Sequence, residues 1–289
     1  MRKLFISLFI STLLVQPSQA FENTLFKIGC SNSDERAVKK VLYSQVKYAN
    51  KSNFEKFIST FDSKYKNADG FNLDVYSSLI KDIWETYDNI EYDIEIQKVS
   101  INGNRASVEA KETSIAELNM SKAYDGELKS EANTIYYLEK KGNGKWKVVS
   151  DTVQDETTTM LYGDAKNLDV KLSVPNPIKA NTDYTATLEF TPPRDTIAIA
   201  SLASDIVEYP QKPTEEIFRT LPEDNILERI FTSNNRNANE YVVASIGLTR
   251  TTVKDLNFRL SLTGFGYTIK RVNVLPEKKG NGTVDDKVK

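Results

Sequence analysis

Hydrophobic positions follow a helical period over the part of the chain that precedes residue 90. In three segments apolar residues recur three and four positions apart, which places them on one face of a helix. Ser52 and Glu55 match a capping box, in which two side chains satisfy free amides at the start of a helix. The pattern predicts three helices, over residues 33–50, 52–61 and 72–87.

The period changes from 3.6 to 2 near Ile90, where apolar and polar residues begin to alternate. The turn sequences "NGN" at 102–104 and "GNG" at 142–144 separate these runs as in antiparallel hairpins. A polar stretch at 117–132 lies between the two hairpins. Helices followed by strands favour an α+β domain at 31–163, cone-like, with three helices on one face of a curved antiparallel sheet. Its strands are expected over 89–101, 105–115, 134–141 and 145–151.

The C-terminal part consists of alternating segments broken by proline- and glycine-containing turns. Many short strands with little helix are typical of a β-sandwich, so we predict an all-β immunoglobulin-like domain over 168–276. A boundary at 163–168 follows, and the polar tail 277–289 is expected to be disordered. Strands are expected over 168–174, 184–190, 196–203, 226–233, 239–249 and 256–276, with a short helix at 214–220.

The N-terminus has the organisation of a secretory signal peptide, residues 1–20. Arg2 and Lys3 precede an apolar run from Leu4 to Val15, and a small-x-small sequence ends at Ala20. The run is shorter than the roughly 20 residues that cross a bilayer, so we expect no stable membrane span. We expect cleavage after Ala20 and export to the periplasm or the extracellular space, with an uncleaved anchor as the alternative.

The chain has a single cysteine, Cys30, which excludes an internal disulfide. The sequence "KIGC" resembles a lipoprotein processing site, where this cysteine would be acylated. However, Glu22, Asn23 and Lys27 separate it from the apolar run, so we favour a cysteine packed near the first helix.

The composition of the chain excludes several kinds of catalytic and binding site. The sequence has no histidine, which excludes nucleophilic catalysis through a Ser-His or Cys-His pair and histidine-ligated metal sites. The 38 basic residues nearly balance the 40 acidic ones and form no basic block, so no nucleic-acid partner is expected. No phosphate-binding or dinucleotide motif occurs, and the acidic loop 69–74 lacks the spacing of a calcium loop. We therefore predict no cofactor and no metal, and we interpret this loop as solvated.

The N-terminal part resembles the nuclear transport factor 2-like (SnoaL-like) superfamily. The resemblance rests on "DERAVKKVLYSQVKYANKSNFEKFISTFDSKY" at 34–65, the third helix and the final strand "GKWKVVSDT" at 144–152, and it covers residues 31–163. It implies a bent sheet around a long helix, with an apolar pocket open at one end. The resemblance also implies a function among those of the superfamily, whose members are isomerases, dehydratases or non-catalytic binding modules. Some of these proteins dimerise through the outer face of the sheet.

Aromatic residues of the helices and strands are the candidates for a pocket wall. Alternation in the second hairpin puts Trp146 and Val148 on one face, which is either core or pocket wall. We expect the apolar stripe of the third helix to belong to the hydrophobic core rather than to a pocket wall. Acid–base candidates include Tyr65, Asp62 and Asp151, although Asp62 fits a turn better. The pocket candidates are Tyr43, Phe57, Phe61, Trp84, Tyr87, Tyr92 and Trp146.

Two classes of function remain. The first is an exported, non-enzymatic binding or scaffold protein that holds a small apolar ligand or a protein partner at the N-terminal cone. The second is an isomerase, dehydratase or hydrolase that works without histidine, through Asp and Tyr in the cone. We favour the first, because the chain lacks histidine and a metal motif and carries an appended sandwich. A homodimer through the N-terminal sheet is a further possibility.

Overall fold

The structure is a computed structural model that describes residues 33–87, 89–121, 124–212, 215–236, 238–254 and 257–276. The predicted signal peptide, Cys30 and the predicted disordered tail lie outside the described residues. Within these ranges no helix has the length and apolar character needed to cross a membrane.

Three helices precede all the strands, as the hydrophobic period predicts. Each buries its apolar stripe: Leu42 of the first helix and Ile83 of the third are almost fully buried. The capping box at Ser52 is wrong, because Asn53 caps the second helix by accepting a hydrogen bond from the Lys56 amide. The helices are α1 (Ser33–Ala49), α2 (Phe54–Ile58) and α3 (Leu73–Thr86).

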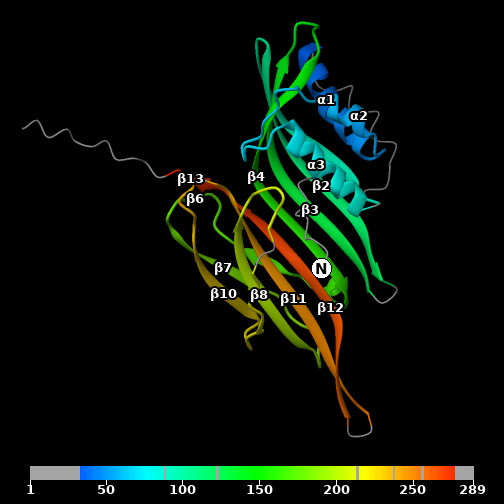
Figure 1. Ribbon diagram of the computed structural model, residues 1–289, viewed down its shortest axis with the longest axis vertical. Helices are drawn as coiled ribbons and strands as arrows, with labels where there is room; N and C mark the ends of the chain where they lie inside the picture. The colour runs from blue at the N-terminus through cyan, green and yellow to red at the C-terminus, as the bar shows by residue number, and fades with distance from the viewer. Residues whose placement is uncertain are drawn as a thin grey trace, which may run out of the picture.

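An antiparallel eight-stranded sheet runs through the whole molecule, in the order β1-β2-β3-β4-β12-β11-β8-β9. A three-stranded sheet, β10-β7-β5, and a two-stranded ladder, β13-β6, complete the fold. Figure 1 shows the helices gathered on the strands of the N-terminal half, with β7 and β10 beside the C-terminal half. The strands are β1 (Glu91–Asn102), β2 (Arg105–Ser121), β3 (Tyr124–Lys140), β4 (Trp146–Gly163), β5 (Lys171–Ser173), β6 (Ile178–Lys179), β7 (Asp183–Glu189), β8 (Ile197–Ile206), β9 (Arg219–Thr220), β10 (Ile226–Thr232), β11 (Glu240–Lys254), β12 (Asn257–Val272) and β13 (Val274–Leu275).

The N-terminal and C-terminal halves share this large sheet, because β4 pairs with β12 from Thr157–Lys270 to Gly163–Gly264. The chain leaves β4 through Gly163, whose φ of 56° favours glycine, into the 3-10 turn Asp164–Asn167. Gly264 lies against this turn, and a Cβ atom there would meet the Ala165 backbone nitrogen at 2.5 Å. The glycines of "TGFG" therefore allow close backbone approach where the two halves join.

Alternation along β11 divides its side chains between two hydrophobic cores. Tyr241 and Val243 belong to the core under the helices, whereas Val242 and Ala244 belong to a second core. The second core lies between the C-terminal strands of the large sheet and the β10-β7-β5 sheet, from which Leu188 is completely buried. The fold is therefore an α+β N-terminal half followed by a β-rich half with two packed sheets.

Two further predictions of local structure are wrong. Within the polar stretch, residues 117–121 form the end of β2 and residues 124–132 the start of β3, because Leu118 and Leu128 are buried in the phase that matches the rest of each strand. The helix predicted at 214–220 is absent from 215–220: Arg219 and Thr220 pair with β8, and Ser245 donates a hydrogen bond to Glu216. Tertiary pairing has overridden the local helix signal.

The free edge of β1 is blocked by a side chain rather than by another strand. The Asn50 carboxamide accepts a hydrogen bond from the Tyr92 amide at 2.7 Å and donates one to the Tyr92 carbonyl at 2.8 Å. It thereby occupies the position of a neighbouring strand, which protects the edge from pairing with another chain.

Candidate functional site

A small cavity lies where the predicted pocket should be, between the helices and the inner face of β1–β3. About 10 Å³ of it is open to the centre of a water molecule, which is room for roughly one water. Aromatic and aliphatic side chains make up most of its wall. The lining residues are Leu42, Gln45, Val46, Ala49, Phe57, Phe61, Tyr76, Ile94, Glu112 and Tyr136.

Glu112 supplies the carboxyl group on this cavity wall. It is 2% exposed, and it accepts hydrogen bonds from the Thr134 hydroxyl at 2.9 Å and from the Tyr136 hydroxyl. Burial raises its pKa well above the usual range, although the Thr134 bond acts in the opposite direction. Glu112 is thus an acid in apolar surroundings, the type of group that general acid–base catalysis requires.

A second buried carboxyl, Asp151, lies beyond the cavity on β4. The Tyr65 hydroxyl donates to it at 2.5 Å, and both side chains are almost completely buried. Burial raises the pKa of Asp151 to about 6, with the Tyr65 hydrogen bond opposing the shift. The loop before α3 is held beside it, because the Ala68 amide donates to the Asp151 carbonyl. The two residues therefore join this loop to the sheet.

The same loop carries an ion pair to the C-terminal half. Asp69 accepts from the Arg271 guanidinium at 2.6 Å and from the Asn239 carboxamide at 2.7 Å. The two side chains of the ion pair are 4% and 0% exposed, so the interpretation of this loop as solvated is wrong for Asp69. Burial alone would lower the pKa of Arg271, but Asp69 and the neighbouring Tyr241 and Glu156 raise it. The pair is a buried contact between the two halves.

Glu156 of β4 is the third carboxyl with a raised pKa. The Tyr241 hydroxyl of β11 donates to its Oε2 atom at 3.2 Å, while Oε1 has no hydrogen-bond partner among the described residues. Burial raises its pKa to about 7, and the Arg271 charge and the Tyr241 bond oppose this. Glu112, Asp151 and Glu156, with the Asp69–Arg271 pair, are called the buried carboxyl cluster below.

The chemistry open to the buried carboxyl cluster is limited by access. Tyrosine, threonine, arginine and asparagine side chains of the same chain hold its members, and only Glu112 borders the cavity. In the part of the chain that the structure describes, no three Asp, Glu, Cys or His side chains are grouped to hold a metal ion. The arrangement can store protons and bind the two halves together, whereas proton transfer to a substrate would need the helices to move.

The predicted pocket residues lie in different surroundings. Phe57 and Phe61 line the cavity and are each 5% exposed. Tyr92 is buried and accepts a hydrogen bond from the Trp84 indole at 2.9 Å, on the same side of the sheet. Tyr43 is 51% exposed on α1 and faces away from the cavity lining.

The other two candidates lie at opposite ends of the helix-covered core. The Trp146 indole donates to Asp34 at 3.3 Å beside the start of α1, and Val148 is buried on the same face, as alternation predicts. Tyr87 donates to the Met160 sulfur at 3.6 Å after the end of α3. Phe57 and Phe61 are thus the two predicted pocket residues that border the cavity.

The sequence carries a signal for Glu112 in the alternation of β2. Ala106, Val108 and Ala110 occupy the buried phase of β2, and Glu112 continues that phase two residues later. A charged residue in the buried phase of a strand marks an inward carboxyl. Arg271 and Tyr241 carried no comparable signal, because their burial depends on which distant strands pair.

Three exposed apolar side chains lie on the C-terminal strands of the eight-stranded sheet, away from the helices. Ile197 of β8 pairs with Thr249 of β11, which pairs with Leu262 of β12, so these side chains lie on one face. Ile197 is 47%, Leu262 44% and Leu260 64% exposed. Figure 1 shows β11 and β12 continuing beyond the neighbouring strands. Ile197, Leu260 and Leu262 are called the hairpin patch below.

Comparisons with known proteins give similarities to solved structures over part of the chain. No protein-family model matches the sequence, and no curated protein matches it. Bd1075 from Bdellovibrio bacteriovorus is 15% identical over 43% of this chain and 42% of its own, with a TM-score of 0.36. Kfla4162 from Kribbella flavida is 12% identical over 42% of this chain and 89% of its own, also at 0.36. A protein assigned as a dehydratase of the NTF2-like family from Streptomyces avermitilis is 14% identical over 43% and 97%, at 0.35.

These similarities are too distant to indicate an activity. The identities are all below 16%, and the TM-scores are all below 0.4. The chain spans less than half of the Bd1075 chain. Function depends on the residues of a site and not on the fold alone.

Proposed function

We propose that this protein is an exported, non-enzymatic scaffold that binds a protein partner, with its helix-covered half serving as a packed support. The observation that carries the proposal is the cavity, which has room for about one water molecule beside Glu112. Ligand pockets for small molecules span roughly 300–1,000 Å³. A cavity this small holds no apolar ligand without rearrangement of Phe57 and Phe61.

The hairpin patch supports a partner-binding role. Its three apolar side chains are each more than 40% exposed on one face of β8 and β12, the two strands that flank β11. Exposed apolar residues grouped on one face are typical of interaction sites, whereas single exposed apolar residues are common on any protein surface. A homodimer through the outer face of β1–β4 is less favoured, because it would desolvate the Lys98–Glu109 and Lys111–Glu131 ion pairs there.

To test whether the cavity is packed, the protein is titrated with xenon or toluene, and binding is measured by NMR chemical-shift changes. We expect the wild-type protein to show no saturable shift and Phe61→Ala to show one, because the substitution opens apolar space at this position. The proposal of a packed support would be overturned if the wild-type protein bound xenon or toluene saturably and Phe61→Ala changed that binding.

Partner binding is tested with a photo-crosslinking amino acid at Leu262, and at Tyr43 as a matched control. Both positions are exposed, but Tyr43 lies on α1, away from the hairpin patch. We expect a defined protein adduct from position 262 that Leu260→Ser abolishes, with none from position 43. Equal adducts from both positions, or an adduct unaffected by Leu260→Ser, would contradict the assignment of the hairpin patch.

The alternative is an isomerase, dehydratase or hydrolase that uses Glu112. The observation that favours it is the Glu112 carboxyl on the cavity wall with the Tyr136 hydroxyl donating to it. This alternative requires the cavity to open in solution. It predicts fast hydrogen exchange at the α2 amides, whereas a packed support predicts slow exchange there.

A further inference from the structure

A second cavity lies in the C-terminal half, at the open edge between the two packed sheets. It offers about 90 Å³ to the centre of a water molecule. Its residues come from β8, β9 and β10 and from the segment before β9, none of which borders the cavity beside Glu112. The lining residues are Leu202, Ile217, Arg219, Leu227, Glu228 and Arg229. It is called the edge cleft below.

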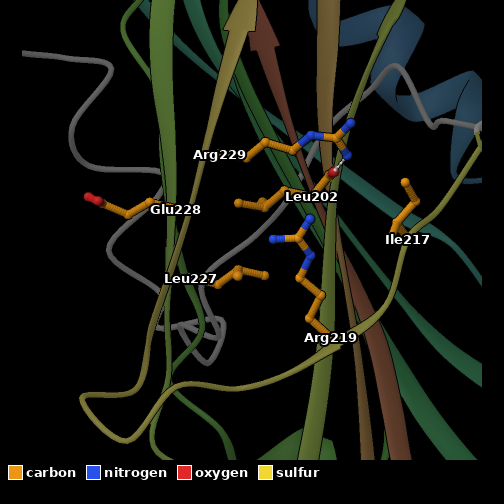
Figure 2. A pocket seen from close by; sticks show the side chains of 6 residues that line it. All are labelled: Leu202, Ile217, Arg219, Leu227, Glu228 and Arg229. Atoms are coloured by element: carbon orange, nitrogen blue, oxygen red, sulfur yellow. Dashed lines mark hydrogen bonds between the residues drawn. The ribbon is translucent and has the colours of Figure 1, made fainter.

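Two arginines give the edge cleft a positive charge. Figure 2 shows the guanidinium groups of Arg219 and Arg229 on either side of Leu202, and both arginines line the cleft. Neither arginine takes part in an ion pair within the described residues. The Glu228 carboxylate points away from them in Figure 2 and accepts a hydrogen bond from Thr187 at 3.3 Å. The two cations therefore share a cleft without a carboxylate between them.

Arg229 is held in position by the protein itself. It donates to the Leu202 carbonyl at 2.5 Å, and its guanidinium lies 5.0 Å from the centre of the Phe231 ring. These contacts cover the edge of β8 where β9 has ended, and they use part of the donor capacity of Arg229. Arg219 lies on the two-residue strand β9 and also lines the cleft, and its side chain has no hydrogen bond or ring contact of this kind to the residues that the structure describes.

The rest of the cleft wall is aliphatic. Leu202 is 2% exposed, Leu227 packs against the second core, and Ile217 is 53% exposed at the mouth. A ligand that fits this wall needs an apolar group next to its negative charge. For comparison, a cavity of about 150 Å³ accommodates benzene, so the edge cleft suits a group of three or four carbons.

We propose that the edge cleft binds the carboxylate of a short branched aliphatic acid, with Arg219 as the principal cation. Guanidinium pairs with carboxylate through two parallel hydrogen bonds, and the aliphatic part would contact Leu202 and Leu227. The same chemistry occurs in a free acid such as 3-methylbutanoate and at the free carboxyl terminus of a peptide ending in leucine. The site is independent of the proposed scaffold function, because the hairpin patch and Leu202 lie on opposite faces of β8.

The experiment is calorimetric titration of the full chain with 3-methylbutanoate, with a pentapeptide ending in leucine, and with the same peptide as its terminal amide. We expect saturable binding of at least one carboxylate and none of the amide. Arg219→Gln should weaken binding about tenfold or more, because a charged hydrogen-bonded pair is lost. Arg194→Gln is the matched control, an exposed arginine in the same half outside the cleft, and should leave binding unchanged.

The outcomes separate the two sources of the carboxylate. Binding of the peptide alone assigns the cleft to a carboxyl terminus, and comparable binding of both assigns it to a free acid. Equal affinity for the amide, an effect of Arg194→Gln as large as that of Arg219→Gln, or no binding of either carboxylate would overturn the proposal. Arg219 is exposed, so a matching thermal unfolding curve for Arg219→Gln will show that the fold is kept.

Discussion

The titration of Glu156 should make the protein less stable as the pH rises from acid to neutral. Burial raises the pKa of this carboxyl from 4.5 to about 7. Because the folded value is the higher one, the folded protein keeps a proton that the unfolded chain has released. The contribution of Glu156 to stability is thus complete below about pH 4.5 and is lost as the pH rises through about 7.

The magnitude follows from the two pKa values. Linkage gives a loss of about 2–3 kcal/mol from Glu156 between about pH 5 and pH 8. Asp151, with its pKa raised by burial to about 6, adds about 1–2 kcal/mol in the same direction. Carboxyls with lowered pKa values, such as Asp34 and Asp62, act in the opposite direction, but only below their ordinary value of 3.8. The window between pH 5 and 8 therefore isolates the buried groups.

Glu156→Gln is the perturbation that tests this account. A glutamine keeps an oxygen for the Tyr241 hydroxyl but carries no proton that titrates in this range. Urea unfolding, followed by tryptophan fluorescence at several pH values, measures the free energy of unfolding. We expect the variant to lose about 2–3 kcal/mol less than the wild type between about pH 5 and pH 8.

The control is Glu95→Gln, which removes an exposed carboxyl of β1 and should leave the pH dependence of the wild type unchanged. A wild-type stability that stays level or increases over this range would refute the assignment of raised pKa values to the cluster. So would an unchanged slope in Glu156→Gln, because the linkage argument leaves no other source for the difference.

Other predictions concern the edge of the sheet and the junction between the halves. Asn50→Ala should lower the free energy of unfolding by about 1–3 kcal/mol in urea titrations, because both backbone groups of Tyr92 lose their partner; Asn50→Asp, which keeps one acceptor, should cost less. Asp69→Ala should cost about 3–5 kcal/mol by the same measurement, because Arg271 would remain buried without its anion; an effect below 1 kcal/mol would contradict the buried pair. Protease cleavage at 164–167 should leave the two pieces associated on a sizing column, since the β4–β12 ladder remains; separation into two folded pieces would show that the ladder contributes little.

Helices and most strands were predictable because each depends on a local period. The α3 stripe with Tyr76, Ile80 and Ile83 is buried as its spacing predicts, and the turns at 102–104 and 142–144 join β1 to β2 and β3 to β4. Among the acid–base candidates, Tyr65 and Asp151 were both named from the sequence, and they form a hydrogen bond. Local pattern was sufficient for the helices and the turns, whereas the Tyr65–Asp151 hydrogen bond joins residues 86 positions apart and depends on the tertiary fold.

The inward carboxyls of β4 were harder to predict, because bulges change the phase of this strand. At the start of β4 the even-numbered residues Trp146 and Val148 point inward. A register shift next to Leu138 then reverses the alternation, so that the odd-numbered Asp151 points inward. A second shift near Asn133 returns the inward phase to Glu156. Simple alternation cannot follow a strand across bulges, because each inserted residue exchanges the two faces.

The long-range pairing of β4 with β12 explains why the polar groups lie where they do. Once these strands are neighbours, the inner face of the helix-covered half extends over β12 and β11, which bring Arg271 and Tyr241 against Glu156 and the loop carrying Asp69. An apolar interface would hold the halves together without such partners, whereas a buried ion pair is satisfied only in one register of the ladder. We therefore expect the buried carboxyl cluster to act first on how the two halves are aligned, and its titration to make that alignment sensitive to pH.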